Sequence, residues 1–219
     1  MNANVNVRSG LADKCSPAVA ALVIVDMVND FVHPQGLTVA GNGRAVDAAR
    51  STIGPIGSLA TAARTAGVPV VYVQHSTMPD GASHSGPWVD ARGRATYSSL
   101  DICLDGSWGQ QVVDELVPRE GDLVVKKHRY SGFARTELDT VLQERGRETI
   151  VVCGVSTNVC VEATARQGFD LDYYVVIPDD ACASWHSGLH EAALATARHR
   201  YAVVCSTSEV ISVWQDSAP

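Results

Sequence analysis

Residues 149–160 read TIVVCGVSTNVC, an apolar run that ends at Gly154 and passes into a segment with helical spacing. The run at residues 149–154 is short and rich in β-branched side chains, which is typical of a strand buried on both faces of a sheet. Residues 159–168 are expected to form a helix, which places Cys160 in its first turn. A strand that runs directly into a helix predicts one unit of a parallel α/β sheet.

The same alternation of apolar runs and helical segments continues over most of the chain. We expect further strands at residues 20–26, 69–74, 122–127, 171–178 and 201–205, and further helices at residues 45–66, 137–145 and 189–198. Alternating strands and helices predict right-handed crossovers and a parallel sheet between two helical layers. The sequence therefore predicts a single α/β domain with three α/β/α layers and a six-stranded parallel sheet over residues 17–219, preceded by a disordered segment at residues 1–16.

The composition and charge of the chain argue against nucleic acids and membranes as its partners. The 219 residues carry a formal net charge of −7 without a basic run, so we do not expect a nucleic-acid partner. No apolar stretch reaches the roughly 18 residues that a membrane span needs, and the first residues lack the apolar core of a signal peptide. We therefore expect a cytoplasmic protein that acts on a small-molecule substrate and does not bind a membrane.

The cysteines are scattered along the chain. They are Cys15, Cys103, Cys153, Cys160, Cys182 and Cys205. In a reducing compartment they are expected to remain thiols rather than form disulfides. A structural zinc site would need closer ligand spacing, so none is expected.

Reactive side chains follow three of the expected strands. Asp26 ends the strand at residues 20–26, Lys127 ends the strand at residues 122–127, and Cys160 follows the strand at residues 149–154. In open α/β sheets the active site lies beyond the carboxyl ends of the strands, so these groups are expected to meet there.

A cysteine in the first turn of a helix has a chemical advantage, because the thiolate is the nucleophile. The positive end of the helix dipole and the Lys127 ammonium would both lower the pKa of the Cys160 thiol. Asp26 would accept the thiol proton and return it to a leaving nitrogen. The free amides of the same turn could bind a developing oxyanion. The pattern indicates a candidate cysteine nucleophile with a proton acceptor and a stabilising charge beside it.

Each of the three residues also has a structural interpretation. An aspartate at a strand end is often a turn former or a helix cap. A lysine there is usually solvated, and Lys126 stands beside Lys127. A cysteine in an apolar helix is more often part of the core than a nucleophile. The joint placement of the three at strand ends is what favours catalysis.

Three segments, in order, carry a family resemblance. They are residues 21–31 (ALVIVDMVNDF), 124–138 (VVKKHRYSGFARTEL) and 151–172 (VVCGVSTNVCVEATARQGFDLD). The chain resembles the isochorismatase-like cysteine hydrolase superfamily from about residue 20 to residue 214. The resemblance implies a Rossmann-like three-layer fold, and a homodimer or homotetramer, because members usually form one or the other.

The resemblance also implies roles for individual residues. Members use an Asp–Lys–Cys triad, which falls on Asp26, Lys127 and Cys160; Lys127 is chosen because the family lysine directly precedes an x-R-Y-S stretch. A non-proline cis peptide before the cysteine loop would fall at Val155–Ser156. The amides of Ser156 and Cys160 would then form the oxyanion hole.

Within the superfamily, the chain is most similar to ureidoacrylate amidohydrolases, through residues 106–122, 129–133 and 157–162. It departs from that branch after the second strand, where residues 74–78 read QHSTM in place of an asparagine with a nearby tryptophan. This departure puts the particular substrate in doubt. Nicotinamidases hold a metal through D-x-H, which does not occur after this strand, so we expect no metal and no cofactor.

Substrate contacts are expected in a long connection at residues 75–109, which is rich in Gly, Ser, Pro and Asp. A connection of this length is typical of a substrate lid or an oligomer contact. Phe31, His75 and Tyr130 are the candidate pocket walls. Core packing is the alternative for the two aromatic residues, and lid surface is the alternative for His75.

The sequence is compatible with two other functions. An isochorismatase-type enzyme would hydrolyse a vinyl ether by protonation from Asp26, and Cys160 would then be dispensable. A non-catalytic binding protein on the same fold would need no triad. The intact set of Asp26, Lys127 and Cys160 favours the amidohydrolase, which would act through a thioester intermediate on a small amide, ureido or carbamoyl substrate.

Overall fold

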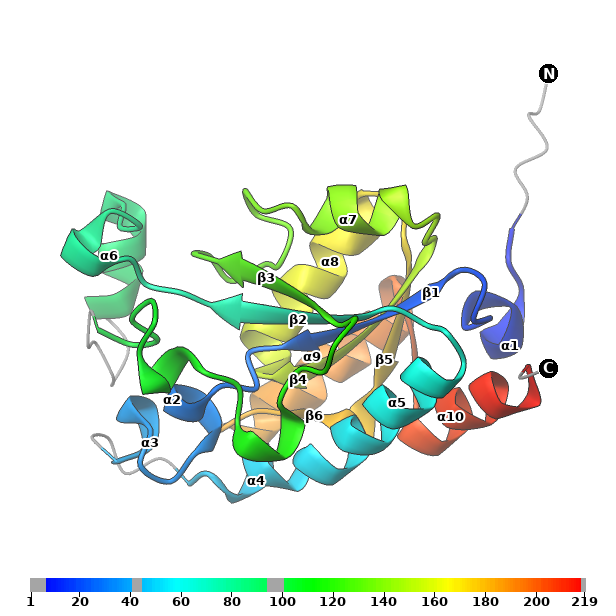
Figure 1. The fold of residues 1–219 in the computed structure, drawn as a ribbon, viewed down its shortest axis with the longest axis horizontal. Helices are drawn as coiled ribbons and strands as arrows, with labels where there is room; N and C mark the ends of the chain where they lie inside the picture. Colours follow the sequence, from blue (N-terminus) through cyan, green and yellow to red (C-terminus); the bar gives the residue numbers. More distant parts are fainter. Residues whose placement is uncertain (1–6, 41–44, 94–100, 218–219) are drawn as a thin grey trace.

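A single sheet with helices on both faces forms the body of the molecule (Figure 1). The structure, a computed structural model, describes residues 7–40, 45–93 and 101–217. The strands are β1 Ala20–Val25, β2 Val70–His75, β3 Leu123–Lys127, β4 Thr149–Val155, β5 Tyr174–Pro178, β6 Cys182–Ala183 and β7 Ala202–Cys205. Their order is β3-β2-β1-β4-β5-β7, with β6 paired to β4, and every pair is parallel.

The prediction of a three-layer parallel α/β fold is confirmed, but the number of strands is wrong. The sheet has seven strands rather than six. The additional strand, β6, is only two residues long and pairs with the end of β4 at Gly154 and Val155. A strand of two residues shows no periodicity, so nothing in the sequence distinguishes it from a loop.

Helices cover both faces of the sheet. The helices of the described residues are α1 Gly10–Lys14, α2 Asn29–Val32, α3 Leu37–Ala40, α4 Asp47–Ser51, α5 Ile53–Thr65, α6 Gly86–Gly93, α7 Leu138–Glu144, α8 Glu162–Asp170, α9 Ser187–Arg200 and α10 Thr207–Asp216; the longer ones cover the faces of the sheet. In Figure 1, α5 and α10 pack together below the sheet, and α7 and α8 lie above it. The helix predicted at residues 45–66 is two helices, α4 and α5, which meet at Thr52.

The strands differ in burial according to their place in the sheet. All six residues of β1 and all seven of β4 are buried, as expected for central strands covered on both faces. At the edge, β3 alternates, with Val125 and Lys127 buried and Val124 and Lys126 exposed. The pleat of this edge strand therefore turns Lys127 towards the interior and Lys126 towards solvent.

The register brings four strand ends to one place. Val25 lies opposite Gly154, and His75 lies opposite Lys127. Gly154 has φ of 115°, and a Cβ at this position would collide with the Val25 carbonyl oxygen. The close approach of β1 and β4 therefore requires glycine here. The residues that follow β1 and β4 come together beside His75 and Lys127.

Two regions outside the sheet bear on the expectations from sequence. The expected N-terminal segment, residues 1–16, contains helix α1, and residues 1–6 lie outside the described part of the chain. The expected lid, residues 75–109, contains η1 Pro79–Gly81, α6 and the start of η2 Trp108–Gln110, whereas residues 94–100 are not described. Among the described residues, no helix is long and apolar enough to cross a membrane.

Candidate active site

Asp26 and Lys127 form a buried ion pair where β1 and β3 end. Lys127 Nζ lies 2.8 Å from Asp26 Oδ2, and neither side chain is more than 1% exposed. The second carboxylate oxygen, Oδ1, accepts a hydrogen bond from the His75 amide at 2.8 Å, and Lys127 Nζ also donates to the Arg129 carbonyl at 3.1 Å. Asp26 itself has φ of 54°, a left-handed conformation that aspartate tolerates better than most residues. The carboxylate is thus fixed at both oxygens.

Cys160 lies beside this ion pair, on a π-helical turn at Thr157–Val161 that leads into α8. Its thiol interacts with both Asp26 and Lys127. The predicted helix therefore begins with a wider turn than an α-helix. Ser156 caps the turn, and its carbonyl accepts from the amides of both Val159 and Val161. The structure brings together the three residues that the sequence predicted.

The protonation of the thiol differs from the sequence-based expectation. Burial raises the pKa of Cys160 to about 12, and the opposing effect of the Lys127 ammonium is too small to offset it. The expectation of a thiol with a lowered pKa is therefore wrong for the free protein. The thiol is protonated at neutral pH, and it needs a base in contact with it. Asp26 is in that position.

Lys127 keeps its charge despite complete burial. Burial works against the ammonium, but Asp26 and Cys160 together outweigh it and raise the pKa of Lys127. A buried charge that is paired and hydrogen-bonded can persist where an isolated one would not. The site therefore holds a permanent positive charge next to the thiol, which would stabilise a thiolate once it forms.

The loop before Cys160 has the predicted backbone. The Val155–Ser156 peptide is cis, as the resemblance implied. Asn158 Oδ1 accepts hydrogen bonds from Ser156 Oγ at 2.8 Å and from Ser184 Oγ at 2.6 Å, which hold this loop against the segment that follows β6. The first turn of a helix leaves amides without intrahelical acceptors, so the placement of Ser156 and Cys160 is compatible with an oxyanion hole.

Thr164, which sequence reasoning did not single out, links the cysteine turn to the lysine strand. Its hydroxyl donates to the Cys160 carbonyl at 2.7 Å and accepts from the Gly132 amide at 2.9 Å. Gly132 belongs to the loop that follows Lys127. The fully buried Thr164 thus fixes the distance between two stretches of chain that carry the triad. In the sequence, only the position of Thr164 four residues after Cys160 could have indicated that it links these two segments.

The three predicted substrate contacts lie in one row of rings beside the triad. The ring of His75 is 6.3 Å from that of Phe31 and 5.7 Å from that of Trp88, and Trp88 is 4.8 Å from Tyr130. Trp185 extends the row on the far side of Phe31. Tyr130 is 42% exposed, which argues against simple core packing. The sequence did not indicate Trp88 or Trp185.

His75 is buried and uncharged. Burial lowers the pKa of His75 well below its ordinary value, and the positive charges of Lys127 and Arg92 lower it further. Its Nε2 lies 2.8 Å from an Arg92 guanidinium nitrogen, so Nε2 accepts that hydrogen bond. Arg92 was also missed by sequence reasoning; its i,i+4 spacing from Trp88 on α6 is the only signal.

The remaining reactive groups have structural roles. Lys126 points outwards and pairs with Asp105 at 2.6 Å. The cysteines other than Cys160 are buried thiols, and burial raises the pKa of each. Within the described ranges, no group of three or more His, Cys, Asp or Glu side chains is arranged to hold a metal ion.

The site combines a thiol, a carboxylate and an ammonium at the carboxyl ends of parallel strands. These are the groups expected of a hydrolase with a cysteine nucleophile. Comparison with known proteins agrees with this class. The model of the isochorismatase domain matches residues 20–209, and the chain belongs to the isochorismatase family.

Several relatives share most of the chain. The ureidoacrylate amidohydrolase RutB of Azorhizobium caulinodans is 38% identical over 171 residues, 74% of each chain. A cysteine hydrolase from Pseudomonas syringae pv. phaseolicola has a similar structure, with a TM-score of 0.83 and 31% identity over 92% of this chain and 95% of its own. N-carbamoylsarcosine amidase from Thermoplasma acidophilum has a TM-score of 0.70 and 33% identity over 86% and 96%.

Proposed function

We propose that this hydrolase cleaves a carbon–nitrogen bond of a small amide, ureido or carbamoyl substrate through a thioester on Cys160. The observation that carries the proposal is the contact of the Cys160 thiol with both members of the buried Asp26–Lys127 pair. The carboxylate supplies a base for a thiol that is otherwise protonated. The ammonium supplies the charge that a thiolate needs in a buried site.

The reaction begins with transfer of the thiol proton to Asp26 as the sulfur attacks the carbonyl carbon. The oxyanion is received by the amides of Ser156 and Cys160. When the tetrahedral intermediate collapses, the C–N bond breaks and the leaving nitrogen takes the proton from Asp26. Water then attacks the thioester and gives a proton to Asp26. Cleavage of the C–S bond releases the acid, and Asp26 returns the proton to the sulfur.

The names of two relatives support a substrate with a ureido or carbamoyl group rather than a simple amide. Both the ureidoacrylate amidohydrolase and the N-carbamoylsarcosine amidase are named for substrates with such a group. In this chain residues 74–78 read QHSTM where the ureidoacrylate branch has an asparagine with a nearby tryptophan, and His75 lies between Phe31 and Trp88. We therefore expect the reacting group to be shared with that branch and the remainder of the substrate to differ.

The experiment is a panel of ureido, carbamoyl and simple amide compounds, scored by ammonia release. The wild-type protein should turn over at least one ureido or carbamoyl compound faster than the simple amides. Cys160→Ala should abolish that turnover, and Cys182→Ala, which removes a buried thiol outside the triad, should retain it.

The panel also separates the alternative functions. Turnover of a vinyl ether that survives Cys160→Ala but not Asp26→Asn would support an isochorismatase-type reaction instead. Absence of turnover on any compound, with no covalent modification of Cys160 by substrate, would support a binding protein. Either result would overturn the proposal.

A further inference from the structure

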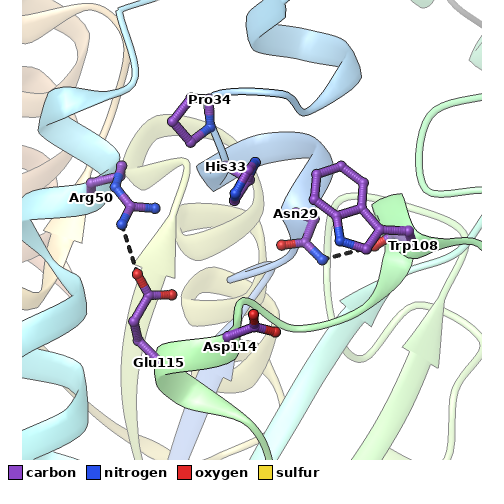
Figure 2. Close-up of a pocket in the computed structure, with 7 residues that line it drawn as sticks. All are labelled: Asn29, His33, Pro34, Arg50, Trp108, Asp114 and Glu115. Carbon is purple, nitrogen blue, oxygen red and sulfur yellow. Dashed lines mark hydrogen bonds and ion pairs between the residues drawn. The ribbon is translucent and has the colours of Figure 1, made fainter.

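A pocket separate from the triad lies between helices α2 and α4 and the short turns η2 and η3 Asp114–Leu116 (Figure 2). Its cavity volume is about 270 Å³. The residues that line it are Asn29, His33, Pro34, Arg50, Trp108, Asp114 and Glu115. No member of the triad is among them, so the pocket is not used by the proposed reaction.

The walls of this pocket are held together by backbone hydrogen bonds. The backbone amide of Asn29 donates to the Gln111 carbonyl at 2.9 Å, and the backbone amide of Val113 donates to the Met27 carbonyl at 3.1 Å. An antiparallel bridge joins Val28 and Val112 between them. The pocket is therefore formed before any ligand arrives, which lowers the cost of binding.

An acceptor on a buried side chain faces the cavity. Asn29 is 3% exposed, and its Nδ2 donates to the Trp108 carbonyl at 2.9 Å, which fixes the amide group. In Figure 2, Oδ1 of the same amide faces the cavity, and it accepts no hydrogen bond from any residue that the structure describes. An oxygen held in this way is stabilised by a ligand N–H.

The charges around the cavity favour a cation. Arg50 donates to Glu115 at 2.7 Å, so these two charges neutralise each other. Asp114, on the same turn as Glu115, has no cationic partner within the described ranges. The wall therefore carries one uncompensated negative charge, from Asp114, which lines the same cavity as Asn29.

An aromatic surface completes the pocket. Trp108 is 45% exposed although its neighbours in η2 are buried, and its indole borders the cavity. The His33 ring stands edge-on to it, with centroids 4.9 Å apart and planes at 84°. Indole is the best of the aromatic side chains for binding a cation over its face.

We propose that this pocket binds a small planar cation of the guanidinium class. Such a cation can stack on Trp108 while its N–H groups reach the Asp114 carboxylate and Asn29 Oδ1. The guanidinium could belong to a free guanidino compound or to an arginine side chain of another protein chain. Both sources share the chemistry that the pocket recognises.

The test is a titration of the ¹⁵N-labelled protein with methylguanidinium chloride, followed through the indole N–H signals of its four tryptophans. Trp108→Phe identifies the signal of Trp108. We expect a saturable shift of that signal, with the other three unchanged. Sodium chloride at equal ionic strength should have no effect, and urea, which is planar and neutral, should bind at least about tenfold more weakly.

Variants and a second ligand complete the experiment. Asp114→Asn should weaken methylguanidinium binding about tenfold, and Glu144→Gln, which removes a charge on the distant helix α7, should leave it unchanged. Tighter binding of a short arginine peptide than of methylguanidinium would indicate a protein as the source, and weaker binding would indicate a free compound. An unshifted Trp108 signal, equal binding of urea, or no effect of Asp114→Asn would overturn the proposal.

Discussion

Asp26 has three polar neighbours that together define what its carboxylate can do. The His75 backbone amide and the Lys127 ammonium each donate to one oxygen, and the Cys160 thiol interacts with the same carboxylate. A carboxylate fixed in this way cannot rotate away from the thiol. Proton transfer between Asp26 and Cys160 therefore needs no rearrangement of the site.

Alkylation of Cys160 should report its high pKa. Because burial raises the pKa to about 12, the thiolate is scarce at neutral pH and increases tenfold with each pH unit. The rate of iodoacetamide labelling of the Cys160 peptide should therefore rise steadily from pH 7 to pH 10. Lys127→Met should slow labelling at every pH, because the ammonium favours the thiolate. A plateau in the wild-type rate below pH 8 would show that the thiol is already ionised.

The sequence predicted that Asp26, Lys127 and Cys160 would meet, and the structure brings them together, but the sequence did not predict their electrostatics. The choice of Lys127 over Lys126 rested on a family motif, and the pleat of β3 gives its physical reason. The pKa of Cys160 depends on how deeply the turn is buried, which spacing does not reveal. Trp88 and Arg92 reach the site from α6, and only the folded chain brings that helix to His75.

At the scale of elements, the site depends on links between neighbouring segments. Thr164 joins the π-helical turn that precedes α8 to the loop that follows β3, through one hydrogen bond to each. Thr164→Val should lower kcat more than it raises KM, because the Cys160 carbonyl loses its donor and the turn shifts. It should also destabilise the fold by about 1–3 kcal/mol. Thr164→Ser keeps the hydroxyl and should restore most of kcat; equal loss of kcat in both variants would contradict this role.

The contact between β1 and β4 can be tested at Gly154. An alanine there would place its Cβ against the Val25 carbonyl oxygen, in addition to the cost of a positive φ. Gly154→Ala should therefore lower the free energy of unfolding by about 3 kcal/mol or more, measured by denaturant titration.

Gly146→Ala is the matched control for this measurement. Gly146 also has a positive φ, of 63°, but no atom lies within 4 Å of its added Cβ. Its substitution should cost only about 1 kcal/mol, from the backbone conformation alone. Similar losses in the two variants would show that strand approach is not the reason for glycine at residue 154.

Short and irregular elements explain most of what sequence did not predict about the fold. Helix α10 was missed although Ser206 and Glu209 form a complete capping box before its apolar residues, a signal that the sequence does contain. By contrast, β6 and the π-helical turn at Thr157–Val161 have no sequence signature. The other long strands and helices, which bury many side chains in a regular pattern, were predictable for that reason.

For the whole molecule, burial of an uncharged His75 links stability to pH. Because the pKa of His75 is lowered in the folded state, protons bind the unfolded chain more tightly. The contribution of the uncharged His75 to the free energy of unfolding is complete above about pH 6.5, the pKa of histidine in the unfolded chain. It is lost as the pH falls from there towards the lower pKa of His75 in the folded protein, by up to about 1.4 kcal/mol per pH unit.

The melting temperature should reveal this linkage. Between pH 7 and pH 5.5 the wild-type protein should lose about 2–4 °C more than His75→Gln, which can still accept a hydrogen bond from Arg92 but does not titrate. Scanning calorimetry in matched buffers measures the difference. Parallel pH dependence in the two proteins would show that His75 is not a source of acid sensitivity.

A covalent thioester on Cys160 should form during turnover. The most direct measurement is rapid acid quenching of the protein with a substrate found in the panel, followed by peptide mass spectrometry. We expect an acyl or carbamoyl adduct on the peptide that contains Cys160, absent in Cys160→Ala. Undiminished turnover by Cys160→Ala, or an adduct on a different residue, would contradict it.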